Sequence, residues 1–334
     1  MTLRAKILEL LSGGRIHDTP AFSGLIHVTA EGLESEGLIF HEIHHDARKM
    51  AKAAASTFKL TGMPSGTLPL DLCAPAEALG AGLNFFEDGE YRFPQPAKAL
   101  FTSTKYLNTA YFQNTDFLKK GRLPLICAAI KILKDNAGED AVISGMIPGS
   151  YTLLLYLIET GGLFAEMKRE PNAVVDALFH LSSFLSQIGN AYKNAGADFI
   201  TIHEMGGSPG FIGPAKFEQF VLPALKELHS RLPSPRVLSV CGNTNKSMLA
   251  LAESGADAIS VDQVNDLAAS RAVLKDVMLF GNIDPVQRLY RGDEAQVAEA
   301  VRGAKEAGVD AVWPGCDLVP QTRVENIRAM MGAF

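Results

Sequence analysis

The sequence predicts an α/β protein, a closed (β/α)8 barrel of the TIM type with an N-terminal helical extension. From about residue 141 onward, short apolar runs alternate with amphipathic helical segments, as in repeated strand–helix units. A glycine, one further residue and an aspartate precede three of these runs. No glycine fingerprint of a dinucleotide or phosphate loop accompanies them, which favours a barrel over an open sheet. We expect one domain over residues 1–334, with 1–65 as the helical segment and 66–334 as the barrel.

Composition limits the classes of function. The 334 residues are 47% hydrophobic and 20% charged, with a net charge of −6 and no run of Lys or Arg. These values predict a globular protein without a nucleic-acid partner and without affinity for an anionic membrane. The N-terminus lacks the features of a signal peptide, and the longest apolar run, 151–158, is too short to span a membrane. The four cysteines are too scattered for a disulfide scaffold, so we expect a cytoplasmic protein.

The N-terminal part contributes helices and the first strand. His41 and His45 are spaced i, i+4, but no second ligand cluster accompanies them, so we interpret them as surface or rim residues rather than metal ligands. Residues 47–59 form a good helical run, and 67–73 read as the first strand. Asp71 ends that strand. Glu77 follows in the next helix, where it faces a ligand or stabilises the helix N-terminus.

The remaining strands follow from residue 141 onward. Residues 141–150 predict a strand and a turn, with a helix starting at Tyr151, and 173–194 predict a long helix. An eighth strand is needed, and we expect it between Gly80 and Lys134. The seven strand candidates are centred near or begin at Leu68, Val142, Phe199, Val237, Ala258, Val277 and Ala311.

Three local signals concern loops and helix ends. The glycine-rich piece 206–210 follows a strand with the wrong spacing for a phosphate loop, which predicts a βα loop able to serve as a mobile lid. Pro223 should kink the amphipathic helix in which it lies. Asp293 and Gln296 are spaced as a capping box that opens the helix through Ala304.

Polar side chains end nearly every predicted strand. In a barrel the carboxyl ends of the strands converge on one mouth, where catalytic residues lie. A row of polar tips is not needed for packing, so we expect a pocket for a small molecule there. The tips supply Asp71, Ser144, Met146, His203, Glu204, Cys241, Asn243, Asp262, Asn282, Asp284, Cys316 and Asp317.

Two of these tips are thiols, which could bind a metal together. Cys241 ends the run 237–240, and Cys316 ends another strand. The residue two positions before Cys241 is Ser239, a poor metal ligand. No nucleophile-elbow motif and no strand-terminal lysine is present. Carboxylates, carboxamides and a histidine suit recognition of a heterocycle with amide-like edges.

The sequence resembles the uroporphyrinogen-decarboxylase-like superfamily, in its branch of methylcobalamin-dependent methyltransferases. The resemblance covers nearly the whole chain, although the N-terminal arginine-rich motif of the decarboxylase is absent. It rests on the segments 40–51, 74–80, 220–223, 281–285 and 314–316.

The resemblance also sets an expectation about metal. Zinc enzymes of that branch carry a His-x-Cys pair on one strand and a distant cysteine on another. This sequence keeps Cys241 and Cys316 but has Ser239 in place of the histidine. A catalytic zinc site usually has three protein ligands, so no zinc and no zinc-activated thiol are expected.

An acceptor that needs no metal is N5 of tetrahydrofolate. The sequence therefore resembles the methylcorrinoid:tetrahydrofolate methyltransferases, as in glycine betaine demethylation. The implied donor is methylcobalamin on a corrinoid protein partner, and the implied acceptor is a pterin. His203, Glu204, Asn243 and Asn282 are then the expected catalytic residues. The expected substrate-binding residues are Asp71, Glu77, Ser144, Met146, Asp262, Asp284, Cys241 and Cys316.

Within that hypothesis, Glu204, Asp262 or Asp284 holds the pterin edge, and the two asparagines hydrogen-bond the ring. His203, Glu77 or a water handles the N5 proton. One alternative is a zinc-dependent methylcobalamin:thiol methyltransferase in which Glu204 or His203 replaces the missing ligand. Another is a corrinoid or tetrapyrrole binder without turnover.

Overall fold

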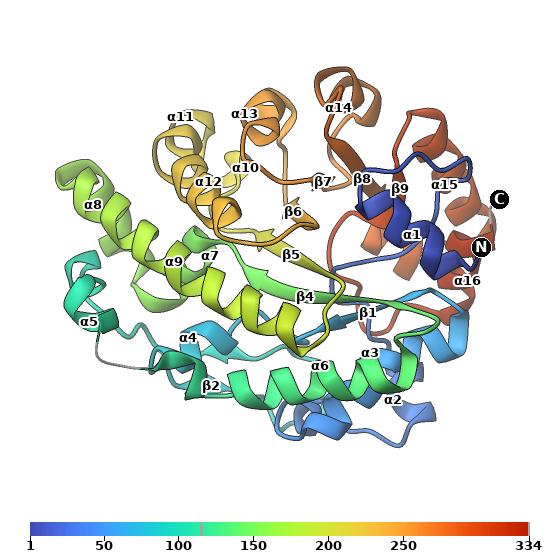
Figure 1. Ribbon diagram of the computed structural model, residues 1–334, viewed down its shortest axis with the longest axis horizontal. Helices are drawn as coiled ribbons and strands as arrows, with labels where there is room; N and C mark the ends of the chain where they lie inside the picture. Colours follow the sequence, from blue (N-terminus) through green and yellow to red (C-terminus); the bar gives the residue numbers. More distant parts are fainter. Residues whose placement is uncertain (114–115, 333–334) are drawn as a thin grey trace.

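The computed structural model describes residues 1–113 and 116–332, and it contains a curled sheet of parallel strands. Seven strands lie in the order β1-β4-β5-β6-β7-β8-β9, each paired in parallel with the next, which confirms the TIM-barrel-like α/β fold. Figure 1 shows the helices packed around this sheet. The strands are β1 (Ser65–Leu68), β4 (Val142–Pro148), β5 (Phe199–Glu204), β6 (Arg236–Val240), β7 (Ala258–Val261), β8 (Met278–Ile283) and β9 (Ala311–Pro314).

The gap between β9 and β1 is filled by an N-terminal segment. Ala21 forms a parallel bridge with Val312, and the backbone N–H of Phe22 donates to the Val312 carbonyl at 3.2 Å. The next N–H, of Ser23, donates to the Ser65 hydroxyl at 3.0 Å on the β1 side. The expectation of an eighth strand between Gly80 and Lys134 is therefore wrong. This closing segment pairs through one bridge and side-chain bonds, so it carries no extended strand pattern.

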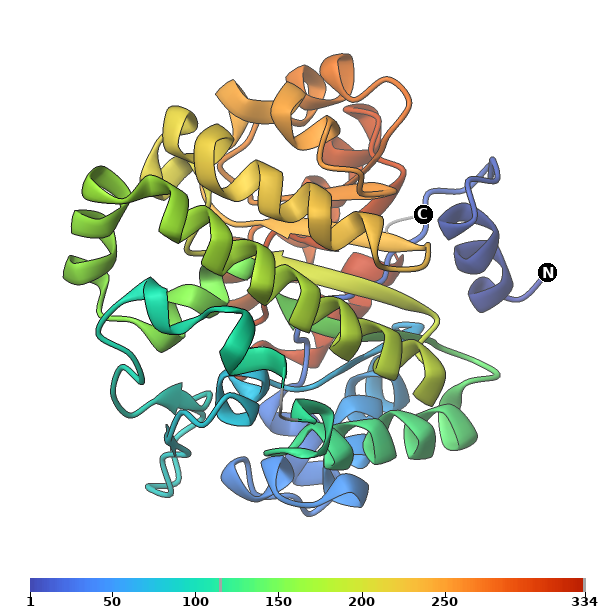
Figure 2. The same cartoon turned by 60° about the vertical axis from the view of Figure 1, so that its left-hand side comes forward.

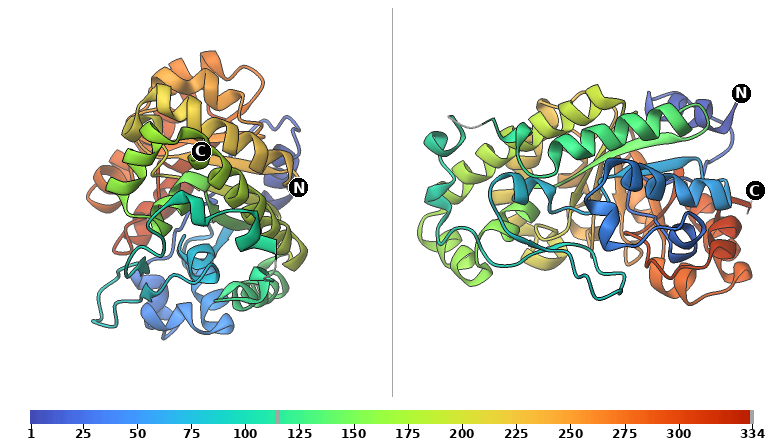
Figure 3. Two further views of the ribbon diagram at one scale, coloured as in Figure 1. Left: turned by 90° about the vertical axis from the view of Figure 1, so that its left-hand side faces the viewer. Right: turned by 90° about the horizontal axis from the view of Figure 1, so that it is seen from below.

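The region expected to hold the eighth strand is an irregular insertion instead. It contains a separate two-stranded antiparallel sheet of β2 (Leu83–Asn84) and β3 (Gln95–Pro96). Figure 3 shows this cyan segment running along one side of the molecule. Its chain is anchored where the backbone N–H groups of Leu100 and Phe101 both donate to the Leu157 carbonyl at 2.9 Å.

The helices surround the sheet in the order of the chain. α3 packs on α6, α6 on α9 and α9 on α12, and both termini lie on the same side of the molecule (Figures 1 and 2). Within the described residues, no helix is both long and apolar enough to cross a membrane. The α-helices are α1 (Leu3–Leu11), α2 (Ala30–Ser35), α3 (Ala47–Thr61), α4 (Ala74–Ala78), α5 (Thr109–Gln113), α6 (Leu123–Ala137), α7 (Ser150–Leu157), α8 (Thr160–Arg169), α9 (Pro171–Ala195), α10 (Pro209–Ile212), α11 (Pro214–Lys216), α12 (Leu222–Ser230), α13 (Met248–Ala252), α14 (Leu267–Val273), α15 (Glu294–Glu306) and α16 (Val324–Gly332). Short turns of 3-10 helix are η1 (His41–His44), η2 (Thr104–Tyr106), η3 (Phe117–Lys119) and η5 (Asn245–Ser247), and π-helical turns are η4 (Phe217–Val221) and η6 (Pro285–Tyr290).

Several local predictions are confirmed by the helix ends. Asp293 accepts from the Gln296 N–H at 2.9 Å and the Gln296 side chain accepts from the Asp293 N–H at 3.1 Å, which is the predicted capping box. Pro223 follows the π-helical turn η4, so the regular helix is interrupted beside the proline. Gly196, in the left-handed region with φ of 119°, ends α9 ahead of β5.

The three aspartates of the repeated Gly-x-Asp motif lie at the amino ends of the strands. Asp198 accepts the Ile143 N–H at 2.8 Å, and Asp310 accepts the Leu279 N–H at 2.8 Å. Asp257 accepts the N–H of Arg236 at 2.7 Å, and the guanidinium of that arginine also donates to it. Each aspartate thus completes the backbone bonding of a neighbouring strand, so the repeat serves the fold.

Aromatic rings fill the barrel toward this same end. Trp313 packs against Phe280 and Phe22, with ring centroids 5.1 Å and 5.2 Å away. Gly24 allows the closing segment to pass close by, since a Cβ on it would lie 2.3 Å from the Thr201 hydroxyl and 2.6 Å from the Trp313 ring. In a barrel of this kind, the carboxyl ends of the strands form the mouth where ligands bind.

Candidate functional site

Three metal-ligating side chains converge at the mouth. His203 lies near the end of β5, Cys241 directly follows β6, and Cys316 follows β9. The His203 Nε2 lies 3.1 Å from the Cys241 Sγ and 4.0 Å from the Cys316 Sγ, and the two sulfurs are 3.2 Å apart. Within the described parts of the chain, this is the one group of three such residues whose ligand atoms all lie within 4.8 Å of one another.

The strand register explains why the histidine reaches the cysteines. His203 on β5 is the direct partner of Ser239 on the neighbouring strand β6, so both side chains point into the barrel. The position expected to carry the histidine is thus occupied by serine, and the imidazole enters from one strand to the side. The argument that Ser239 deprives the site of a third ligand is therefore wrong. The expectation that zinc is absent loses its basis.

A carboxylate lies behind the histidine. The Asp317 Oδ2 is 3.8 Å from the His203 Nδ1, and the other carboxylate oxygen accepts the N–H of Ile26 at 2.8 Å. Metal-bound histidines usually direct their second ring nitrogen toward such a group, which sets the tautomer and the ring orientation. Asp317 was recognised as a polar tip from the sequence, but the sequence assigned it no role.

The protonation states suit a soft divalent metal. Burial lowers the pKa of His203, but the charges of Asp317 and Cys316 outweigh it and raise that pKa to about 9. The hydrogen bond from Cys241 and the nearby His203 hold the pKa of Cys316 well below its usual value, whereas the pKa of Cys241 is raised by its hydrogen bond to Cys316 and by burial. These shifts favour a proton on His203 and on Cys241 and a negative charge on Cys316. One histidine and two cysteines fit the ligands of a catalytic zinc site with an open position.

Glu204, adjacent to His203, points the other way. As residues alternate along a strand, its carboxylate faces outward and meets the N-terminus of α7. It accepts the backbone N–H groups of Tyr151, Thr152 and Gly207 at 3.2, 3.0 and 2.8 Å. Burial raises the pKa of Glu204, although these donors lower it. Its observed role is to hold α7 on β5, apart from the three ligands.

Asp71 and Glu77 are held by one arginine that the sequence analysis did not single out. The Arg122 guanidinium makes two bonds to the Asp71 carboxylate, at 2.7 and 3.1 Å, and its Nε donates to Glu77 at 2.7 Å. Burial raises the pKa of Asp71, but the Arg122 charge more than offsets this and lowers it strongly. Both predicted ligand-binding acids are thus committed to a buried ion-pair cluster.

The predicted residues at the ends of β6 and β7 connect neighbouring loops. Asp262 accepts the Gly242 N–H at 2.8 Å and the Val264 N–H at 3.2 Å. Asn243 uses its amide oxygen within its own turn, where it accepts the Asn245 N–H at 3.2 Å. These bonds fix the backbone immediately after Cys241.

The predicted residues at the end of β8 also make backbone bonds. The amide nitrogen of Asn282 donates to the carbonyls of Asp262 and Asn265, at 3.1 and 3.0 Å. Asp284 accepts the N–H groups of Val286 and Gln287, both at 2.8 Å, and caps the π-helical turn η6. Asn282 therefore ties β8 to the β7 loop, while Asp284 starts the next turn.

The two predicted residues of β4 lie inside the barrel. Ser144 and Met146 are buried, and the Ser144 hydroxyl donates to the Gly24 carbonyl at 3.1 Å and bonds the Thr201 hydroxyl at 2.8 Å. Of the histidines near the N-terminus, His45 packs on the Phe85 ring with a centroid distance of 4.2 Å. This contact agrees with the expectation of a rim residue.

Tyr156 on α7 is a residue of the mouth that the sequence analysis missed. Burial raises its pKa, with smaller contributions from the charges of Cys73, Asp71 and Asp317. Tyr156 is half-buried, so its hydroxyl can contact a ligand at the mouth. The sequence signal was hidden, because 151–158 reads as a plain apolar helix.

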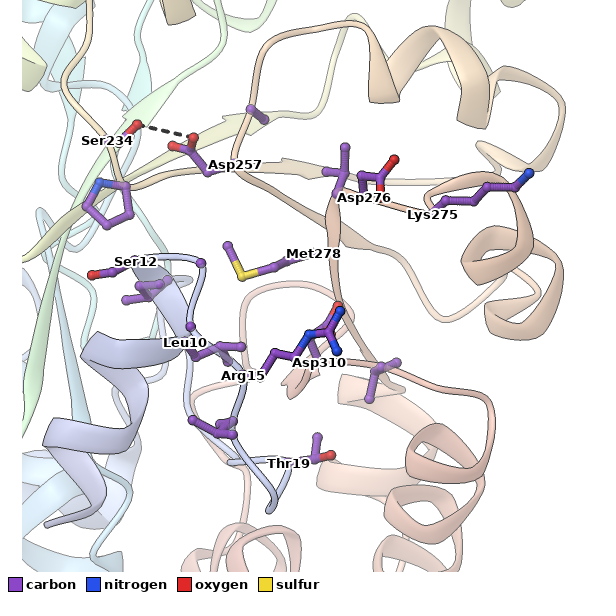
Figure 4. Close-up of a pocket in the computed structure, with 18 of the residues that line it drawn as sticks. Leu10, Ser12, Arg15, Thr19, Ser234, Asp257, Lys275, Asp276, Met278 and Asp310 are labelled. Carbon is purple, nitrogen blue, oxygen red and sulfur yellow. Dashed lines mark hydrogen bonds between the residues drawn. The ribbon is translucent and has the colours of Figure 1, made fainter. Parts of the chain in front are cut away.

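A large cavity opens at the other end of the barrel and contains none of the predicted site residues. Its volume is about 1000 Å³, and it lies between the loop after α1 and the segments that lead into β6–β9 (Figure 4). Its wall includes Arg15, Asp257 and Lys275. Because barrel enzymes carry their chemistry at the carboxyl ends of the strands, the converging histidine and cysteines define the candidate active site.

Comparison with known proteins identifies the family of the chain. The sequence matches the family described as uroporphyrinogen decarboxylase (URO-D) over residues 2–334. A methylcobamide:CoM methyltransferase, MtaA of Methanosarcina barkeri, is 29% identical over 334 residues, which cover 99% of this chain and 97% of that protein. MtbA of Methanosarcina acetivorans, also a methylcobamide:CoM methyltransferase, is 28% identical over 99% of this chain and 96% of its own.

The fold gives the same relationship. The structure of a methyltransferase from Methanosarcina mazei superposes with a TM-score of 0.93 at 27% identity, covering 100% of this chain and 98% of that one. The chain therefore belongs to the uroporphyrinogen decarboxylase (URO-D) family, in the branch whose relatives are methylcobamide methyltransferases.

Proposed function

We propose that this protein transfers a methyl group from a methylcorrinoid to a small thiol, with zinc held by His203, Cys241 and Cys316. The observation that carries the proposal is the convergence of these three ligand atoms within 4.8 Å at the barrel mouth. The methylcobamide and coenzyme M named for MtaA and MtbA set the substrate classes to test. The methyl donor is a corrinoid, carried by a corrinoid protein partner.

The residues of this chain prepare the site for a thiol. His203 is fully buried and Cys241 is 7% exposed, so the walls keep bulk water from the ligand atoms. Asp317 orients the imidazole and compensates its charge while the histidine carries a proton. Zinc bound there lowers the pKa of a coordinated thiol, so that the sulfur is a thiolate at neutral pH. The Tyr156 hydroxyl supplies a polar contact for the remainder of the acceptor.

The tetrahydrofolate acceptor stays a prediction, and the geometry favours it less. Of the acids proposed to hold the pterin edge, Glu204 bonds the α7 backbone, Asp262 the β6–β7 loops and Asp284 the turn η6. The amide nitrogen of Asn282 also donates to two backbone carbonyls. A pterin would have to compete with these bonds, whereas a thiol needs none of them.

The experiment that tests the proposal compares acceptors and metal in one preparation. Purified protein, with its zinc content measured, is incubated with methylcobalamin and either coenzyme M, other small thiols or tetrahydrofolate. We expect loss of the methyl–cobalt absorption with thiols, in proportion to bound zinc. Transfer to tetrahydrofolate by zinc-free protein would overturn the proposal. Methylcobalamin binding without loss of the band for any acceptor would favour a non-catalytic corrinoid binder.

Calorimetry of zinc binding tests the ligand set directly. At pH 7.5 the raised pKa values of His203 and Cys241 keep a proton on each of these two groups in the metal-free site. Since all three ligands must bind in their deprotonated forms, zinc binding should release at least two protons. Titrations in buffers of different ionisation enthalpy give this number. Release of no proton would mean that the metal binds elsewhere.

Moving the histidine from position 203 to its register partner, position 239, provides a matched control. His203→Ser should lose zinc and thiol methylation, because two cysteines remain as the only protein ligands of the three. Adding Ser239→His should restore zinc binding in part, because position 239 lies beside position 203 in the register and also points inward. Restoration of zinc by Ser239→His, absent from Ser239→Ala in the same background, would identify the ligand role of the imidazole.

A further inference from the structure

The glycine-rich loop after β5 is tied to the cysteine strand. The Ser208 hydroxyl donates to the Cys241 carbonyl and accepts the Gly210 N–H at 3.2 Å. Gly210 lies so close to the chain after β6 that a Cβ on it would be 2.8 Å from the Asn243 nitrogen. The expectation that 206–210 is a mobile lid therefore does not fit these contacts. The loop is held as a support beside Cys241.

This support presents an aromatic ring to solvent. Phe211 is 67% exposed, although its ring also lies against Gly242: a Cβ there would be 3.6 Å from its Cε2 and 3.8 Å from its Cζ. An exposed aromatic ring next to a candidate active site has no role in the core. It is therefore available to a ligand that covers the mouth.

A second exposed apolar side chain lies on the loop after β7. Asp262 in that loop accepts the N–H of Gly242 at 2.8 Å, and Val264 follows with 53% exposure. Ser208 and Asp262 thus hold the carbonyl of Cys241 and the N–H of the next residue, respectively. Both loops are therefore bonded to the backbone at Cys241 and Gly242, so Phe211 and Val264 lie on loops next to Cys241.

We propose that Phe211 and Val264 seat the corrin ring of the methyl donor over the thiol site, an inference that rests on the proposed function. Methyl transfer requires the sulfur, the methyl carbon and the cobalt to lie nearly in line, so the corrin face must lie above the sulfur. The S–CH₃ bond forms as the Co–CH₃ bond breaks, and the electron pair of that bond stays on the cobalt, which leaves as cob(I)alamin. A corrin presents a broad apolar face, which these two exposed apolar side chains can contact.

The test measures the KM for free methylcobalamin, which carries no protein and reports on the ring alone. We expect Phe211→Ala to raise this KM roughly tenfold and Val264→Ala about threefold, since each removes apolar contact area. The KM for the thiol and the bound zinc should not change. Phe211→Trp should keep the low KM because it restores a flat aromatic surface.

Val273→Ala is the matched control for Val264→Ala. Val273 is 41% exposed at the end of α14, next to the segment that borders the cavity at the opposite end of the barrel. Val273→Ala should leave the KM for free methylcobalamin unchanged. Wild-type protein that methylates no thiol would refute the proposed function. Active wild-type protein with an unchanged KM in both Phe211→Ala and Val264→Ala would refute this inference alone.

Discussion

Two clusters of ionisable residues lie at the barrel mouth, and they differ in how their groups are bonded. On the β1 side, Arg122 directs three donors to Asp71 and Glu77. On the β5, β6 and β9 side, His203 and two sulfurs face one another, and the carboxylate of Asp317 lies behind the histidine, 3.8 Å from its Nδ1. The first cluster is complete within the protein. The second has electron pairs available for a metal and a substrate.

The comparison shows why polar residues at strand ends are not equivalent. A buried charge is stabilised either by an opposite charge and hydrogen bonds or by binding a ligand. Asp71 is paired with Arg122, Glu204 is held by hydrogen bonds alone, and the histidine–cysteine group is left to bind a ligand. The following predictions test this division, from the largest expected effect to the smallest.

Removing a sulfur should disable only the second cluster. Cys241→Ser or Cys316→Ser should weaken zinc affinity on the order of 1000-fold, roughly 4 kcal/mol, because one of three protein ligands is lost. Thiol methylation should fall in parallel. The free energy of unfolding of the metal-free protein should change little, as shown by urea titration. Full zinc occupancy in both variants would contradict the assignment.

Removing Arg122 should instead lower the stability of the protein and leave its zinc affinity unchanged. Arg122→Met leaves the buried Asp71 carboxylate without its partner, so the free energy of unfolding should fall by about 3–5 kcal/mol. The double variant with Asp71→Asn should recover part of that loss, because no buried charge remains. Zinc affinity of the folded protein should be unchanged. Loss of zinc from a variant of normal stability would mean that the two clusters are coupled.

The pH dependence of stability should distinguish His229, a buried histidine of the fold, from His203 of the candidate site. Burial, followed by the Arg236 charge, lowers the pKa of His229 to about 4 from its usual 6.5. Between pH 6.5 and about 4, His229 binds a proton in the unfolded chain but not in the folded protein. The free energy of unfolding should therefore fall as the pH decreases through this range. The full difference is about 3 kcal/mol. Urea unfolding at several pH values measures it, and His229→Gln should flatten this dependence.

His203 should behave differently in the same measurement. Its raised pKa by itself would add stability that is present below 6.5 and is lost as pH rises through about 9. The lowered pKa of Cys316, caused first by its hydrogen bond with Cys241 and then by His203, favours the thiolate in the folded protein and acts in the opposite direction. The two shifts therefore offset each other in the pH dependence of stability near neutral pH. His203→Gln should leave the pH dependence of the metal-free protein between pH 7 and 8 nearly unchanged.

Among the changes in zinc affinity, the smallest should come from the carboxylate behind the histidine. Asp317→Asn keeps the bond to the Ile26 N–H but removes the charge near the imidazole. Zinc affinity should fall about 10- to 100-fold, as for other residues that orient a metal-bound histidine. Competition with a coloured chelator measures the change. An effect as large as that of Cys316→Ser would indicate that Asp317 itself binds the metal.

Local signals in the sequence determined much of the architecture. The alternation of apolar runs and helices predicted the seven strands of the sheet, because strand and helix periods differ. The capping box at Asp293 and the interruption at Pro223 depend only on neighbouring residues, and both are observed. The convergence of polar tips at one mouth followed from the parallel fold alone.

Only the tertiary structure decided which tips form the site. The register of β5 against β6 places His203 beside Ser239, and no local pattern encodes the alignment of strands that are separated by a helix. The same holds for Arg122, which reaches Asp71 from 51 residues away, and for residues 20–23, which close the barrel. Such pairings are set by long-range packing, so the imidazole that is missing from β6 is supplied beside it by β5.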